Sequence, residues 1–374
     1  MMKLIVTKKH VSLFIFLFVN FIFCAKYSSR ITAYYLLLSI ASTVCYFIIW
    51  YKKDAIQALF KRIKINYLTL VFVYFLVCCA LFYLIPKETL HVDRWSVITT
   101  FWDYYFENKY VYFAQSFDKN YPGPMPFYFL LALPFYFVGE LGLFSFLGIL
   151  LFVILFNKFY LNCNYIIPFV LISTSLFYVW EICSRSNLFL NGTLILFSIV
   201  FFFKNYNKSF YNTLVHGIIF GFLLSTRNVF IIPYIIAFIY AIRSEKIDIK
   251  NTFFIAIIAL LAFVVTFVPF VWNHITDFKK MNPFTIQSNG LMPLKYSLFF
   301  ILTSFFIAFK CKSQDDVYFF SGVLLFITIV FYFLYTINGC GFYNTFFNSV
   351  ADISYFILCI PFCMYHFLIL KNNQ

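Results

Sequence analysis

Apolar runs of 13 to 22 residues recur from one end of this 374-residue chain to the other, separated by short polar breaks. Runs of this length suit a hydrocarbon solvent, in which an α-helix satisfies its own backbone hydrogen bonds. Only 11% of the residues are charged, against about 25% in soluble domains, and the alternating pattern of a membrane β-strand is absent. The sequence therefore predicts an all-α, polytopic transmembrane helix bundle that forms a single domain over residues 1–374.

Charge in the polar breaks predicts the orientation of the chain, because cytoplasmic loops are enriched in Lys and Arg. The break after the second apolar run opposes one acid, Asp54, to five basic residues, which predicts a cytoplasmic loop. Residues 87–125 form the longest polar stretch. Their four basic and five acidic residues give a net charge of 4 − 5 = −1, which predicts an extracytoplasmic loop. The five basic residues of the cytoplasmic break are Lys52, Lys53, Lys61, Arg62 and Lys64.

Counting along the chain predicts about twelve crossings with both termini inside. This count holds if residues 126–156 cross once, although their break at Gly139 also allows a re-entrant pair. The formal net charge of +14 comes from basic residues in loops and at helix ends, where they fix orientation, so the expected partner is the lipid bilayer and not nucleic acid. The crossings are predicted near residues 11–25, 31–51, 66–86, 126–156, 164–180, 188–203, 212–224, 229–242, 252–273, 297–309, 317–336 and 351–370.

The early extracytoplasmic loop contains a predicted amphipathic helix. Trp95, Ile98, Phe101, Trp102 and Tyr105 recur at helical spacing, with polar residues mainly between them. Such a helix is suited to lie flat at the membrane surface with its aromatic face toward lipid.

Asp93 precedes this helix, at the predicted mouth of the membrane domain. It is either a helix N-cap or solvated loop charge, or a carboxylate held in a partly desolvated place where it can act as a general base.

Three more ionisable residues fall at predicted outer helix ends: Glu181, Arg185 and Arg227. Ionisable groups at membrane depth are candidates for function, although each arginine could instead be an anchor that snorkels to lipid headgroups. Glu181 and Arg185 are four residues apart with Glu first, so one helical turn would pair them. Supporting polar residues lie in the same loops: Arg94, Asp118 and Asn187.

Residues 124–139, a Pro-rich and Tyr/Leu-rich helix start that ends in Phe-Val-Gly, follow Asp93 and the amphipathic stretch. This arrangement resembles the GT-C superfamily of polytopic glycosyltransferases, and residues 180–187 and 221–227 are similar to later segments of that family. The resemblance implies an essential aspartate at Asp93, a polyprenyl-phosphate sugar donor, a glycan or lipid acceptor, and a place in the bacterial inner membrane. The second outer loop lacks the Asp-x-Asp pair of many members, which leaves the use of a divalent metal open.

Sugar transfer from a lipid phosphate needs a base for the acceptor hydroxyl and positive charge for the departing phosphate. Asp93 is the predicted base, and Arg185 and Arg227 are the predicted phosphate ligands. Two alternatives are an O-antigen or capsule-type polysaccharide polymerase and a non-enzymatic flippase or transporter. Polymerases usually carry their large loop later in the chain, and no repeat of the transporter kind is visible.

Overall fold

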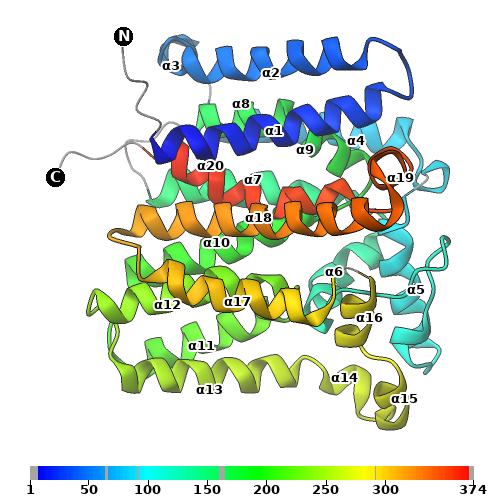
Figure 1. Cartoon of the computed structure of the whole chain (residues 1–374), viewed down its shortest axis with the longest axis vertical. Coiled ribbons are helices and arrows are strands. Elements are labelled where there is room, and N and C mark those ends of the chain that lie inside the picture. The colour runs from blue at the N-terminus through cyan, green and yellow to red at the C-terminus, as the bar shows by residue number, and fades with distance from the viewer. Residues whose placement is uncertain (1–6, 64–65, 91, 160–164, 291, 370–374) are drawn as a thin grey trace.

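A computed structural model of the chain describes all residues except 1–6, 64–65, 91, 160–164, 291 and 370–374 (Figure 1). Lys64, which contributed to the predicted orientation, lies outside the described residues. Every regular element in the described part of the chain is a helix, so the predicted all-α class is confirmed.

Five helical segments are long and apolar enough to cross a membrane. The most deeply buried of them is α10, which packs against α7 and α20 at the centre of the bundle. The five segments are α1 (Lys8–Ser28), α4 (Tyr67–Leu84), α10 (Leu188–Asn205), α13 (Ile249–Val265) continued by α14 (Val268–Val271), and α18 (Gln314–Cys340).

Three further pairs of helices pass the same test together but are bent, which brings the number of candidate spans to eight. The sharpest bend follows α6, which ends at Gly139 with a left-handed φ of 82° that glycine adopts without a Cβ clash. The pairs are α2 (Tyr35–Tyr51) with α3 (Lys53–Ile63) at 66°, α6 (Pro126–Val138) with α7 (Gly142–Phe159) at 119°, and α8 (Ile166–Thr174) with α9 (Leu176–Cys183) at 64°.

The remaining predicted crossings fall on shorter apolar helices, so helix length alone gives five to eight spans and not twelve. These helices are α11 (Phe210–Leu224), η3 (Asn228–Phe230) with α12 (Ile231–Arg243), α17 (Leu294–Ala308), and η4 (Ile353–Cys359) with α20 (Ile360–Leu368). The short connecting helices are η1 (Lys87–Thr89), α5 (Arg94–Phe106), η2 (Val111–Phe113), α15 (Ile275–Lys280), α16 (Pro283–Gly290) and α19 (Phe342–Phe346).

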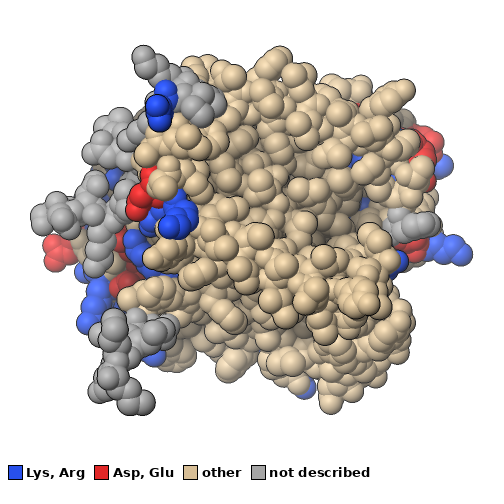
Figure 2. All heavy atoms as spheres, turned by 90° about the horizontal axis from the view of Figure 1, so that it is seen from above, with Lys and Arg blue, Asp and Glu red and all other residues tan. Residues whose placement is uncertain are grey.

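The helices of the bundle run roughly side by side, so that their connections gather at two ends (Figure 1). We call these the α5 end, with α5, α15, α16 and α19, and the α3 end, with α3. Seen from above, the charged side chains lie at the two ends, and the broad belt between them carries almost none on this face (Figure 2). The connections that the charge pattern places outside are at the α5 end. The basic break after α2 is at the opposite end.

The predicted amphipathic helix is present as α5, but its aromatic face does not point to lipid. Ile98, Phe101 and Trp102 are at most 2% exposed. The Phe101 ring stacks on Phe129 of α6 with 3.6 Å between ring centres and meets Phe270 of α14 at 5.1 Å. These contacts form a second hydrophobic cluster at the α5 end, separate from the main core. The expected membrane-facing orientation is therefore wrong, because α6 and α14 bury that face.

Candidate functional site

Arg94, the first residue of α5, is paired with a carboxylate from near the other end of the sequence. Its Nη2 donates to Oδ2 of Asp352 and, at 3.0 Å, to Oγ of Ser354. Asp352 also accepts from the backbone N of Ser354 at 2.8 Å and thereby caps η4. Burial alone would lower the pKa of Arg94 and raise that of Asp352. Burial is the largest single influence on each, but their mutual attraction outweighs it when it acts together with the hydrogen bonds from Ser354 and the charges of neighbouring groups. The pKa of Arg94 is therefore raised and that of Asp352 is lowered.

Arg227, in the link between α11 and η3, is half-buried and differs from Arg94 in forming no ion pair with any acid that the structure describes. Its guanidinium lies 5.7 Å from the ring centre of Tyr128 and 5.9 Å from that of Tyr355. Arg94 lies over the same Tyr355 ring at 5.6 Å. No ion pair among the described residues includes Arg227. Burial lowers the pKa of Arg227, and the charge of Arg94 acts in the same direction, while Tyr355, Tyr128 and Asp352 act against them without reversing the shift.

Three further polar groups lie near the two arginines or near the residues that contact them. Lys26, near the end of α1, is 2% exposed and interacts electrostatically with Asp352. The amide of Asn187, in the link between α9 and α10, lies next to the Tyr128 hydroxyl but outside hydrogen-bond geometry. Glu181 is fully buried, and its Oε1 accepts from the backbone N of Phe189 at 2.9 Å.

The cluster of Lys26, Arg94, Arg227, Asp352 and Glu181 has a net charge of 3 − 2 = +1 when both acids are ionised. Asp93, which interacts with Arg94 from the edge of the cluster, is not counted in this sum. The Nε atoms of both arginines are buried and have no hydrogen-bond partner among the described residues. Buried donors without partners are rare in folded proteins and costly. Guanidinium groups match the oxygens of phosphate or carboxylate, so this arrangement is suited to bind an anion.

Asp93 occupies the N-cap position of α5, yet its side chain makes no capping hydrogen bond. Its Oδ2 accepts from Oγ of Ser116 and from Nδ2 of Asn120, both at 2.8 Å. No hydrogen bond within the described part of the chain reaches its other oxygen, Oδ1. Asp93 is half-buried and interacts electrostatically with Arg94, the next residue. The carboxylate therefore anchors the turn at 116–120 with one oxygen and leaves the other available.

Arg185 belongs to a different group, in which its charge is neutralised. The side chain is 1% exposed, and its Nε and Nη2 donate to the two carboxylate oxygens of Glu140 at 3.1 and 3.3 Å. Its other donors reach the backbone oxygens of Cys183 at 2.7 Å and Phe82 at 3.2 Å. Arg185 therefore links α4, the α6–α7 turn and the end of α9.

The predicted pairing of Glu181 with Arg185 is wrong, because α9 ends before the second residue. Arg185 has a left-handed φ of 56°. The backbone N of Arg185 donates to the oxygen of Ile182, and that of Ser186 donates to the oxygen of Glu181. This is the Schellman arrangement that terminates helices. The Glu181 carboxylate turns instead to the first turn of α10, where the helix dipole favours a negative charge.

The four predicted ionisable groups are thus not one site. Arg94 and Arg227 come together with Asn187 and Glu181 nearby, whereas Arg185 lies with Glu140. No ion pair in the described part of the chain joins Asp93 to Arg185 or Arg227. Asp118 is exposed on the turn after η2.

The sequence analysis missed Asp352 and the two tyrosines, Tyr128 and Tyr355. Asp352 was detectable, since it is one of only 14 acidic residues and stands at the start of the last apolar run, where an ionisable residue calls for a partner. The tyrosines carried no signal, because 29 tyrosines are spread along the chain.

The fold and this cluster define the class of the molecule as a multi-helix bundle of the membrane-spanning kind with an arginine-containing charged cluster at one end. No family model, curated protein or solved structure matches the chain. The described residues contain no group of three or more His, Cys, Asp or Glu that could hold a metal ion. The cationic cluster itself does not fit a divalent metal, because its donors carry positive charge.

Proposed function

We propose that the protein is a membrane glycosyltransferase that moves a sugar from a polyprenyl-phosphate donor to a glycan or lipid acceptor. The observation that carries this proposal is the pair of guanidiniums, Arg94 and Arg227, that share the Tyr355 ring and whose Nε donors have no hydrogen-bond partner among the residues that the structure describes. Arg94 takes the phosphate-binding role first expected of Arg185, because Glu140 already neutralises Arg185.

The chemistry follows from where charge develops. The acceptor hydroxyl oxygen forms a bond to the anomeric carbon, the bond from that carbon to the phosphate oxygen breaks, and its electron pair leaves with the phosphate. Arg94 and Arg227 stabilise the negative charge on the departing phosphate. Asp93 takes the hydroxyl proton on Oδ1, while Ser116 and Asn120 fix the carboxylate through Oδ2. No step is assigned to a metal.

The proposed orientation places the α5 end outside the cytoplasm of a bacterial inner membrane and both termini inside. Twelve crossings result if each bent pair and each shorter apolar helix counts as one span. The basic break after α2 and the acidic loop around α5 support this orientation, since they lie at opposite ends of the bundle (Figure 1). Polysaccharide polymerisation uses the same phosphate chemistry and stays the closest alternative. Transport would instead need a polar path between the helices, from one end of the bundle to the other.

A transfer assay with Asp93→Asn tests the proposal. Membranes containing the wild-type protein should move label from radiolabelled polyprenyl-phosphate sugars to a membrane glycan or lipid. Asn keeps an oxygen for Ser116 and Asn120 but cannot take a proton, so turnover should fall roughly 10²-fold while donor binding stays nearly unchanged. A matched control is Glu107→Gln, at the other end of α5, where the acid pairs with Lys109 on the surface. A fully active Asp93→Asn protein would show that Asp93 only anchors its loop.

A further inference from the structure

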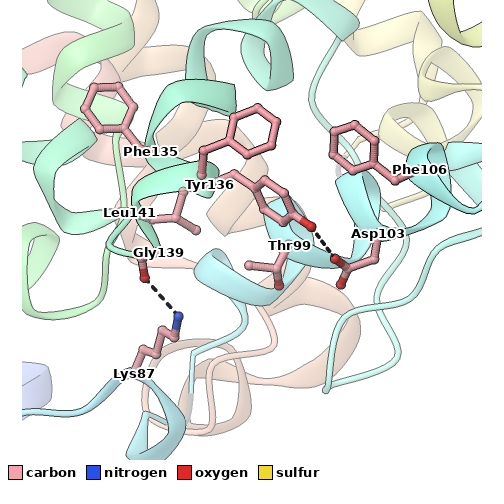
Figure 3. A pocket seen from close by; sticks show the side chains of 9 residues that line it. Lys87, Thr99, Asp103, Phe106, Phe135, Tyr136, Gly139 and Leu141 are labelled. Carbon is pink, nitrogen blue, oxygen red and sulfur yellow. Dashed lines mark hydrogen bonds between the residues drawn. The ribbon is translucent and has the colours of Figure 1, made fainter.

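A cavity of about 510 Å³ lies between α5 and the α6–α7 turn (Figure 3). Its volume falls within the range of small-molecule sites, about 300–1,000 Å³. Two of its residues, Thr99 and Asp103, are five and nine positions after Arg94 on α5. At 3.6 residues per turn, Asp103 is about half a turn around the helix from Arg94. The cavity is therefore on the other side of α5 from the arginine cluster and is a second place where a ligand can bind.

The charged groups of this cavity are balanced and only partly used. Nζ of Lys87 donates to the backbone oxygen of Gly139 at 3.0 Å, and Oδ1 of Asp103 accepts from the Tyr136 hydroxyl at 2.7 Å (Figure 3). An ammonium has three donors and a carboxylate two accepting oxygens, so each has capacity for a ligand. With one positive and one negative group, the cavity selects neither an anion nor a cation. A ligand with both donors and acceptors and no net charge fits best.

Four aromatic side chains form one wall of the cavity. Phe106, Phe135, Tyr136 and Phe137 line it. The Tyr136 ring stacks on Phe106 with 6.0 Å between centres, and Phe135 stacks on Phe144 at 5.1 Å, so these rings are held in place by packing. Flat ring faces pack against the C–H face of a sugar ring, which the negative face of the aromatic system attracts. A lipid chain would also contact the rings. It would, however, bury Lys87 and Asp103 without forming hydrogen bonds in place of those that these groups make to water.

We propose that this cavity binds a neutral sugar residue of a glycan or glycolipid, with the ring against the aromatic wall and the hydroxyls on Lys87, Thr99 and Asp103. Phe106 and Phe137 are 50% and 68% exposed at its rim, so a sugar carried on a longer glycan can enter from the side. The proposal goes beyond the proposed function, because binding here needs neither the arginine cluster nor sugar transfer.

The test is calorimetric titration of the full-length protein in phosphatidylcholine nanodiscs, free of sugar detergents, with maltose, lactose and diacetylchitobiose. At least one should bind with a Kd in the millimolar range or tighter. Asp103→Asn should weaken that binding by about 10-fold, the loss expected when a hydrogen bond to a charged group is removed. Tyr136→Phe keeps the ring and removes only the hydroxyl that holds the Asp103 carboxylate in place, so it should weaken binding by a smaller factor. Glu88→Ala, beside Lys87 but outside the cavity, is the matched control and should bind as the wild type does.

The outcomes separate this proposal from the previous one. Arg227→Met should keep sugar binding, and Asp103→Asn should keep the binding of inorganic phosphate to the arginine cluster. If none of the three sugars binds saturably in the millimolar range, or if they bind Asp103→Asn and Tyr136→Phe as well as the wild type, the cavity is not a sugar site. Failure of transfer activity with sugar binding intact would overturn only the proposed function.

Discussion

Arg185 and Arg227 both lie in links that follow apolar helices, but they differ in whether other residues neutralise their charge and accept their hydrogen bonds. Arg185 is 1% exposed and all three of its nitrogens have partners, including both oxygens of Glu140. Arg227 has two tyrosine rings beside it, no acidic partner in the described part of the chain, and an Nε without a hydrogen bond. Their sequence contexts gave both the same predicted role.

The difference teaches how to tell a structural charge from one kept for a ligand. A buried charge is tolerated when the fold neutralises it and satisfies its donors. Arg185 meets that condition and joins three segments, so we assign it a structural role and no role in ligand binding. Arg227 does not meet this condition. Arg94 meets it only in part, since Asp352 occupies Nη2 while Nε has no hydrogen-bond partner within the described ranges. An anion that both arginines bind would supply the negative charge and the hydrogen-bond acceptors that these two side chains lack.

The largest expected effect is on stability, through Arg185→Leu. The change leaves Glu140 without its partner and should lower the free energy of unfolding by about 3 kcal/mol. That is the lower end for a broken buried pair, because the Glu140 side chain is 27% exposed. Thermal unfolding in nanodiscs would measure it. Replacing both partners, Glu140→Leu with Arg185→Leu, should recover part of the loss. A single variant as stable as the wild type would show that the pair is not structural.

The second effect should be on ligand binding and not on stability, through Arg227→Met. Removing an unneutralised charge should leave the unfolding midpoint unchanged or higher. Binding of inorganic phosphate should weaken by roughly 10-fold or more, since a charge-assisted hydrogen bond contributes about 1.5–3 kcal/mol. Arg227→Lys keeps the charge without the planar fork and should fall between the two. Equal phosphate affinity in all three proteins would remove Arg227 from the site.

The sequence was sufficient for the class of fold, because long apolar runs have few alternatives to membrane helices. It was also sufficient for the helix α5, whose spacing is regular. It was not sufficient for what α5 faces: the same aromatic stripe suits lipid or protein, and the choice depends on α6 and α14, which pack from elsewhere in the chain.

The site was harder to predict for a similar reason. Arg94 pairs with Asp352, 258 residues away, and no local pattern reports a contact of that kind. Arg185 lost its predicted partner because α9 stops after Cys183 without the glycine that usually marks such an end. Asp93 was correctly placed at the start of a helix, but its two hydrogen bonds come from a loop with no regular period.

The smallest effect should be the pH dependence of the Arg94–Asp352 pair. Arg94 is intermediate between Arg185 and Arg227, because only part of its guanidinium is paired with an acid. Asp352 has a lowered pKa in the folded protein, so its stabilising contribution is fully present above the unfolded value of about 3.9 and is lost as the pH falls through the lower folded value. The difference in unfolding midpoint between the wild type and Asp352→Asn should be constant between about pH 5 and 7 and should shrink in stronger acid, where Asp352 is itself neutral. The difference between the wild type and Arg227→Met should have a much smaller acid limb, because Asp352 attracts Arg227 only across the cluster and no ion pair in the described part of the chain joins them. An acid limb as large as that of Asp352→Asn would mean that an acid neutralises Arg227 directly, and the contrast with Arg185 would then disappear.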